Sequence, residues 1–382
     1  MKNKRHLVFG MFAALALPAF AKQDPPANDP PTVPNKVQIA ILLDTSGSME
    51  GLIGQAKTQL WKVVNTFTEA KRDGQVPFVE VALYEYGNSG LHVGNHYIRQ
   101  IEPLGRDLDE ISRELFALRT NGGEEYCGAV IQRALSDLSW DASKQTYKAI
   151  FIAGNEPFTQ GSVDARQACK DALSKGVIVN TIHCGPREQG ISGSWHDGAA
   201  LAGGKFLVID QDKAVAHIPA PQDKAIADLS IELNKTYLGY GKNREEASQK
   251  QQLADKDAAD NAQAGAAVER AKTKASGNYN NSNWDLVDGV REKKVDPSKL
   301  APAELPEAMR GLKPEERAAF IEQAATQRGE IQKKIAGLTA EREVFVQKEH
   351  EKKAVGGDKT LDEAIAETTR EQAARVGYVF GK

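Results

Sequence analysis

Residues 37–49 constrain this chain more than any other stretch, because an apolar run there stops abruptly on an aspartate followed by hydroxyl side chains. Val37 to Leu43 are almost all apolar and prone to β-structure, which predicts a strand buried on both faces, as in a parallel sheet. From Leu52 to Phe67 the apolar residues follow helical spacing. The aspartate and two serines therefore lie in a loop between the carboxyl end of a strand and a helix, which is where open α/β sheets bind ligands.

Asp44, Ser46 and Ser48 place one carboxylate and two hydroxyl groups on a single turn. Oxygen ligands of this kind suit Mg²⁺, Mn²⁺ or Ca²⁺ rather than Zn²⁺. A simpler interpretation is that Asp44 caps the helix while the serines form a turn, but this accounts for only one of the three oxygens. The pattern favours a divalent-cation site, with Mg²⁺ as the first expectation.

An Asp-x-Ser-x-Ser loop after a hydrophobic strand resembles the first metal-binding loop of the von Willebrand factor type A domain. The resemblance covers about residues 36–240, a little over half of the chain. It implies an α/β fold with a doubly wound, mainly parallel, Rossmann-like sheet. In that family a partner's Asp or Glu fills an open coordination place on the cation. The resemblance therefore implies a cation-dependent protein-binding module, of the adhesion or scaffold kind, without catalysis.

The chain departs from the family at the two later metal-binding loops. In place of a Gly-Gly-Thr stretch it has residues 122–125, Gly-Gly-Glu-Glu, so either glutamate can stand where the threonine would be. In place of the aspartate after the fourth strand it has Gly154, which leaves Asn155 or Glu156 as a substitute. The expected metal site then has six members: Asp44, Ser46, Ser48, Glu124, Glu125 and Asn155.

Two other functions stay open at this point. A metal-dependent hydrolase would need a base near the metal, which Glu124, Glu125 or His196 could supply. Against it, the sequence has no nucleophile elbow, phosphate loop, His-Glu-x-x-His motif or Rossmann glycine fingerprint. The departures in the later loops also allow a scaffold whose metal site is degenerate.

His92 and His96 lie four residues apart in the sequence. A position in a loop explains them better than a pair of metal ligands.

Residues 1–21 have the features of a signal peptide: a basic start, an apolar core too short to span a bilayer, and a small-x-small cleavage site ending at Ala21. They predict export to the periplasm or the medium, and a proline-rich linker is expected over 22–35. The net charge of −3 and pI of about 6.2 give no reason to expect nucleic acid as a partner. No later stretch predicts a transmembrane segment. Three cysteines, an odd number, show no zinc spacing.

Residues 241–382 predict a helical region that is partly coiled-coil-like. A long helix is expected from Pro314 to Lys353, with proline in its first turn. Its apolar residues form a heptad-like stripe, namely Ile331, Ile335, Leu338 and Phe345. The stripe covers too few heptads to separate a coiled coil from an antiparallel helical hairpin. This region is therefore expected to pack on the domain, to self-associate, or to bind a partner.

Overall fold

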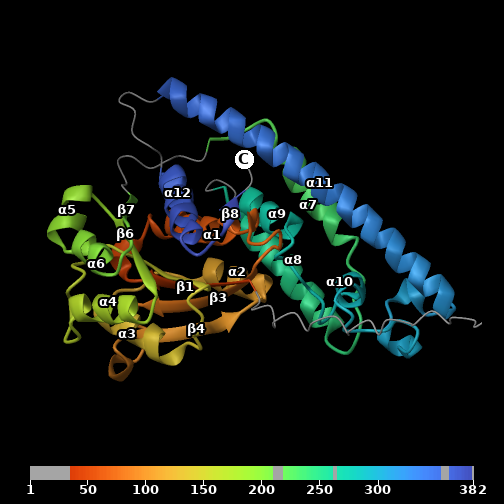
Figure 1. Cartoon of the computed structure of the whole chain (residues 1–382), viewed down its shortest axis with the longest axis horizontal. Helices are drawn as coiled ribbons and strands as arrows, with labels where there is room; N and C mark the ends of the chain where they lie inside the picture. The colour runs from red at the N-terminus through yellow and green to blue at the C-terminus, as the bar shows by residue number, and fades with distance from the viewer. Residues whose placement is uncertain (1–34, 210–217, 261–264, 354–360, 381–382) are drawn as a thin grey trace, which may run out of the picture. The chain divides into compact units, whose positions relative to one another are not determined.

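The computed structural model describes residues 35–209, 218–260, 265–353 and 361–380 (Figure 1). The predicted signal peptide with Ala21, and all of the predicted linker except Asn35, lie outside the described residues, and both stay predictions. Asn35 is buried, and its side-chain amide donates to the carbonyl of Arg72. From Asn35 onward the described residues form one compact unit.

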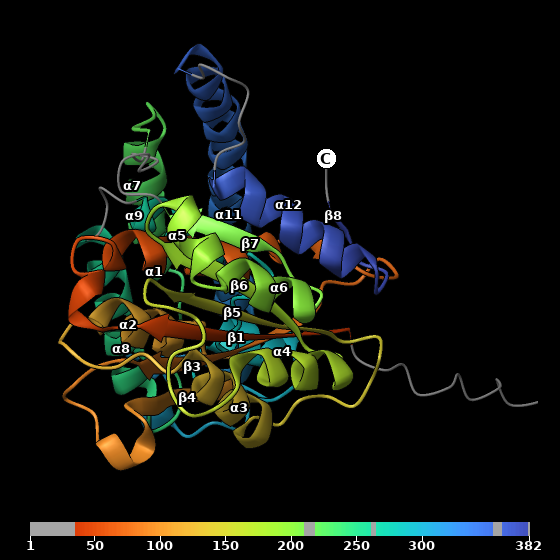
Figure 2. The ribbon, with the colours of Figure 1, turned by 90° about the vertical axis from the view of Figure 1, so that its left-hand side faces the viewer.

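A six-stranded sheet organises the described residues, with the strand order β4-β3-β1-β5-β6-β7 that Figure 2 shows. Every neighbouring pair is parallel except β3 and β4, which are antiparallel. The strands are β1 (Lys36–Asp44), β3 (Phe78–Tyr86), β4 (Ile98–Gly105), β5 (Tyr147–Gly154), β6 (Ile178–Cys184) and β7 (Phe206–Ile209). This confirms the predicted α/β fold with a mainly parallel sheet. The apolar run found in the sequence is the central strand, β1.

Helices cover both faces of the sheet because side chains alternate along each strand. Ile39 and Ile41 of β1 point into one apolar core, whereas Ala40 and Leu42 point into a second one on the opposite face. The first core is covered by α1 (Ile53–Thr66), α2 (Leu108–Ala117) and α12 (Leu361–Ala374). The second is covered by α3 (Cys127–Asp137), α4 (Ala165–Ser174) and α6 (Trp195–Leu201).

The apolar spacing of Ile226, Leu229, Ile231 and Leu233 predicts a helix that closes the domain; this helix is present but lies away from the sheet. In α7 (Asp223–Asn234), Ile226 and Leu233 pack against α9 (Ala266–Ala275) and α11 (Pro314–Lys353). The sheet is covered instead by α12, from a distant part of the sequence. The Gln372 side chain accepts hydrogen bonds from Tyr147 of β5 and Asn180 of β6, at 2.9 and 3.0 Å. Just beyond α12, β8 (Val379–Phe380) pairs with β2 (Ala70–Lys71).

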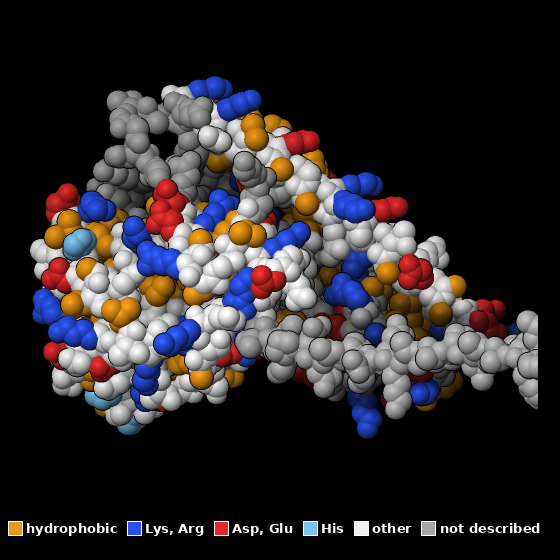
Figure 3. Space-filling model, in the orientation of Figure 1, with side chains coloured by type: hydrophobic (Ala, Val, Ile, Leu, Met, Phe, Trp, Pro, Cys, Tyr) orange, Lys and Arg blue, Asp and Glu red, His pale blue; other side chains and the backbone are white. Residues whose placement is uncertain are grey.

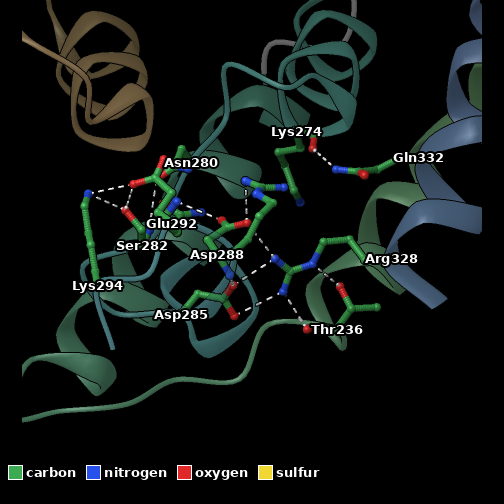
Figure 4. A network of polar contacts seen from close by, with 12 residues as sticks. Thr236, Lys274, Asn280, Ser282, Asp285, Asp288, Glu292, Lys294, Arg328 and Gln332 are labelled. Carbon is green, nitrogen blue, oxygen red and sulfur yellow. Dashed lines mark hydrogen bonds and ion pairs between the residues drawn. The ribbon is translucent and has the colours of Figure 1, made fainter. Parts of the chain in front are cut away.

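The long helix predicted over residues 314–353 is present as α11 with those bounds. Ile331 and Ile335 of the apolar stripe are buried against α7 and α9, so this part of the stripe is covered within the chain. Arg328 of α11 forms ion pairs with Asp285 and Asp288, near α10 (Figure 4). The remaining elements are α5 (Arg187–Ser192), α8 (Arg244–Asp260), α10 (Leu286–Arg291), and the 3₁₀ turns Gly47–Met49, Val93–Asn95, Pro302–Glu304 and Glu307–Met309.

Two further observations concern membrane-spanning helices and surface charge. Among the described residues, no helix combines the length and apolar character that crossing a membrane requires. On the face shown in Figure 3, acidic and basic side chains are interspersed, and neither sign forms a continuous field.

Candidate metal centre at the carboxyl edge of the sheet

Loops from distant parts of the sequence meet where β1, β3 and β5 end, at what we call the carboxyl edge. The N–H of Thr45 donates to the Tyr86 carbonyl, and the Thr45 carbonyl accepts from the N–H of Asn121, both at 2.9 Å. The Ser48 hydroxyl donates to Asn155 Oδ1 at 3.0 Å. The three loops expected to carry the metal site therefore lie together, as parallel strand topology requires.

Asp44 is the centre of this edge and is fully buried. Its Oδ1 accepts a 2.7 Å hydrogen bond from the N–H of Ser46. Among the described residues, its Oδ2 has no hydrogen-bond partner of normal geometry, although buried carboxylate oxygens are usually paired. Burial raises the pKa of Asp44 to about 7; the N–H of Ser46 opposes this, and the nearby Glu125 adds to it.

Neutral oxygens extend from Asp44 across the edge. Ser46 Oγ lies 2.8 Å from Ser48 Oγ, which in turn lies 3.0 Å from Asn155 Oδ1. Adjacent ligands of an octahedral Mg²⁺ with bonds of about 2.1 Å are about 2.9 Å apart. The oxygen spacing across Ser46, Ser48 and Asn155 is thus that of neighbouring ligands in such a shell.

The two glutamates have different positions. Glu125 is buried, and burial raises its pKa to about 7, while the Ser46 hydroxyl lowers it and Glu156 raises it further. In the orientation that gives both the oxygen and the nitrogen of the Gln160 side-chain amide a hydrogen-bond partner, the nitrogen donates to Glu125 Oε2 at 3.0 Å. Glu124 is exposed and accepts a hydrogen bond from the Tyr126 hydroxyl. The structure therefore brings Glu125 to Asp44 and leaves Glu124 outside.

Glycines make this convergence possible. A methyl group on Gly87, whose φ is +78°, would lie 2.7 Å from Asp44 Oδ1 and 2.9 Å from Glu125 Cγ. A methyl group on Gly154 would lie 2.5 Å from the Tyr86 hydroxyl oxygen and 3.1 Å from Asp44 Oδ2. The position where the resembled family carries an aspartate thus has no room for a side chain, and the side-chain oxygen of the next residue, Asn155, lies beside Ser48 instead.

The donor set fits a divalent cation. Two buried carboxylates with raised pKa values lie side by side, and no described Lys or Arg forms an ion pair with either of them. Burying charge without a partner is costly, and a bound cation would remove that cost. Hydroxyl and amide oxygens supply the remaining ligands. Among the described residues, no group of three or more His, Cys, Asp and Glu side chains is arranged to hold a metal, so a site here depends on these neutral oxygens.

The other residues singled out in the sequence lie outside this centre. His92 caps a 3₁₀ turn by accepting from the N–H of Gly94, and His96 packs against the Tyr126 ring. His196 is close to Asp197 and contacts the Phe206 ring. All three cysteines are buried free thiols: Cys127, Cys169 and Cys184.

Sequence reasoning missed two contributors to the carboxyl edge. Gly87 follows β3 directly, and a glycine after a buried strand was the available signal, since its positive φ needs one. Glu85 accepts from the Thr45 hydroxyl at 2.9 Å and pairs with Arg99, which fixes the residue next to Asp44. No local pattern in the sequence marks this second contact.

Comparisons with known proteins give the following picture. No family model matches the chain, and no curated protein matches it. Similar solved structures include BatB from Bacteroides thetaiotaomicron, at 18% identity and a TM-score of 0.35, over 46% of this chain and 90% of that one. The SpRpn10 VWA domain, at 16% identity and a TM-score of 0.35, is matched over 49% of this chain and 90% of its own. An aerotolerance-related membrane protein from Bacteroides fragilis, at 18% identity and a TM-score of 0.31, is matched over 46% and 92%.

The fold is von Willebrand factor type A-like. This likeness concerns the fold alone, and at these TM-scores no argument about function rests on it.

Beside Ser48 and Asn155, the type A-like domain has an open groove of about 540 Å³. One wall is the segment around Pro157, and the other runs from Cys184 into α5. The groove reaches the candidate metal centre at the Ser48–Asn155 hydrogen bond. A molecule lying in the groove would therefore pass directly beside a cation held at the carboxyl edge.

Proposed function

We propose that the type A-like domain binds a divalent cation at the carboxyl edge and through it binds a protein partner outside the cytoplasm. The observation that carries the proposal is the buried Oδ2 of Asp44, which has no hydrogen-bond partner of normal geometry among the described residues, beside the buried carboxylate of Glu125. Two such groups are expensive to keep without a positive charge. The predicted signal peptide supports an exported location.

Asp44 and Glu125 would hold the cation by charge, and Ser46, Ser48 and Asn155 would contribute neutral oxygens. Mg²⁺ is our first choice, with Mn²⁺ or Ca²⁺ as alternatives, because all three prefer oxygen ligands. When bound, the cation supplies a positive centre with coordination places left for water or for an atom of the partner. No reaction is part of this proposal.

Calorimetric titration of the mature protein with Mg²⁺, Mn²⁺ and Ca²⁺ tests the cation. We expect binding by the parent and loss of binding in Asp44→Asn, which keeps the shape of the side chain and removes its charge. Asp164→Asn is a matched control, because Asp164 caps α4 by accepting from the N–H groups of Arg166 and Gln167. No heat of binding in the parent at millimolar cation would reject the proposal and favour a scaffold with a degenerate site.

A pull-down from the exported fraction, with and without EDTA, tests the partner. A protein retained by the parent, lost on chelation and absent with Asp44→Asn is the expected result. Release of a small-molecule product on incubation with the same fraction would favour the hydrolase alternative instead.

A further inference from the structure

The charge at the carboxyl edge bears on what kind of partner the cation can bind. With Asp44 alone, a divalent cation would leave one positive charge to attract a carboxylate. With Glu125 as well, the two carboxylates and the cation sum to zero. Glu124 and Glu156 lie near Glu125, and among the described residues neither forms an ion pair with a Lys or Arg. The loaded edge is thus neutral at its centre and negative around it.

The groove that leads to this centre also carries negative charge. Among the described residues that line it, Glu156 is the single charged one, and the others are polar or apolar, as at Ser48, Leu52 and Gln189. Among the described residues, no ion pair links Glu156 to a Lys or Arg. The Glu156 backbone carbonyl accepts a 2.7 Å hydrogen bond from Trp195 Nε1, which fixes the backbone from which its carboxylate projects.

Basic side chains near these loops are engaged elsewhere. Arg119 donates to the carbonyl groups at the end of α2, including Phe116 and Leu118. Arg99 forms its ion pair with Glu85, and Arg187 lies over the Phe206 ring. Among the described residues, no Lys or Arg lines the groove or pairs with Asp44, Glu125 or Glu156, so a partner that brings a positive side chain would complement them.

We propose that the groove accepts a basic peptide segment of the partner protein, with a Lys or Arg side chain beside Glu156 and a neutral oxygen or water, rather than an Asp or Glu, completing the cation shell. This inference rests on the proposed function, since it takes the cation to be bound by both Asp44 and Glu125. Charge complementarity of this kind sets the choice of partner and the rate of association.

Two acetylated and amidated peptide libraries test this inference. Both have the same randomised neutral positions, and they differ in a central residue that is Lys or Arg in one and Asp or Glu in the other. Each is passed over the immobilised mature protein in millimolar Mg²⁺ at low and at physiological salt, and retained peptides are measured by mass spectrometry. The variants are Glu156→Gln and a control with the same charge change far along the chain, Glu315→Gln, at the exposed start of α11.

We expect the basic library to be enriched over the acidic one by about tenfold at low salt, with the difference shrinking as salt rises. Glu156→Gln should lose most of this enrichment, and Glu315→Gln should keep it. Enrichment of the acidic library, or equal retention of both, overturns the inference while calorimetric Mg²⁺ binding leaves the proposed cation site standing. Absence of Mg²⁺ binding in calorimetry overturns both together.

Discussion

Asp44 and Glu125 approach one point from two loops: a methyl group on Gly87 would lie within 3 Å of both side chains, 2.7 Å from Asp44 Oδ1 and 2.9 Å from Glu125 Cγ. Neither carboxylate has a basic partner among the described residues. Burying either carboxylate as an ion is therefore costly unless positive charge neutralises it or is bound beside it. A proton and a divalent cation are the two candidates, and they compete.

The competition predicts how stability depends on pH. The carboxyl groups of Asp44 and Glu125 have a pKa near 4 in the unfolded chain and of about 7 in the folded protein. Folding at a pH between these values therefore takes up protons. Their contribution to the free energy of unfolding is complete below about pH 4 and is lost as pH rises through 7. In EDTA we expect a loss on the order of 2–4 kcal/mol between pH 5 and 8, which Mg²⁺ reverses at pH 8.

Urea unfolding at the two pH values, with EDTA or with Mg²⁺, measures this effect. Other groups also titrate in this range, so the relevant quantity is the difference between the parent and Asp44→Asn. A pH slope in EDTA that is unchanged in Asp44→Asn would show that these carboxyls do not carry it.

The second prediction separates the two adjacent glutamates. Glu125→Gln should weaken Mg²⁺ binding by about 10–100-fold, because the charge count of the ligands tunes affinity for such cations. Glu124→Gln should change it by less than about twofold, because Glu124 is exposed and bonded to Tyr126. Calorimetry on the two variants gives the comparison, and equal losses would place both glutamates in the shell.

The third prediction concerns Gly87. Alanine there combines an unfavourable positive φ with a clash against Asp44 and Glu125, and we expect a cost of about 3 kcal/mol. Gly51 is a matched control, since its φ is +87° and a methyl group there meets nothing within 4 Å. Gly51→Ala should cost only about 1 kcal/mol. Urea unfolding of both variants measures the difference, and similar costs would mean that the clash is relieved at little expense.

The fourth prediction tests the ion pairs in Figure 4. Arg328 is buried and contacts the buried Asp285 at 2.8 Å, so Arg328→Ala leaves the Asp285 carboxylate inside the protein without a basic partner among the described residues. We expect a loss of about 3–5 kcal/mol. Arg291 contacts Asp288 from an exposed position, so Arg291→Ala should cost below about 1 kcal/mol. Thermal unfolding of the two variants measures the two costs, and equal shifts in Tm would contradict the expected difference between the buried and the exposed ion pair.

Much of the sheet could be predicted because its information is local. β1 is marked by an almost entirely apolar run, and α11 by its proline start and spacing, so both appear where the sequence places them. The packing of α7 could not be predicted, because Ile226 and Leu233 show that a helix buries one side but not against which neighbour. The place beside the sheet is filled by α12, whose Gln372 finds its partners Tyr147 and Asn180 far away in the sequence.

The same distinction applies to the candidate site. Asp44, Ser46 and Ser48 stand on one turn, so their spacing predicts their convergence. Glu124 and Glu125 are adjacent, and the choice between them depends on the loop at Gly87, which no local pattern connects to them.

The position of α12 also has a consequence for how the protein is made. Ile365 and Tyr378 belong to the same core as β1, so that core cannot be completed until residues 361–380 are available to it. During synthesis, and during any passage across a membrane, the part of this face that α12 covers would stay exposed, while α1 and α2 could already cover the rest. Contacts between such distant residues slow folding. A chain that is still threading through a translocation channel would thus be kept from folding too early by its own topology.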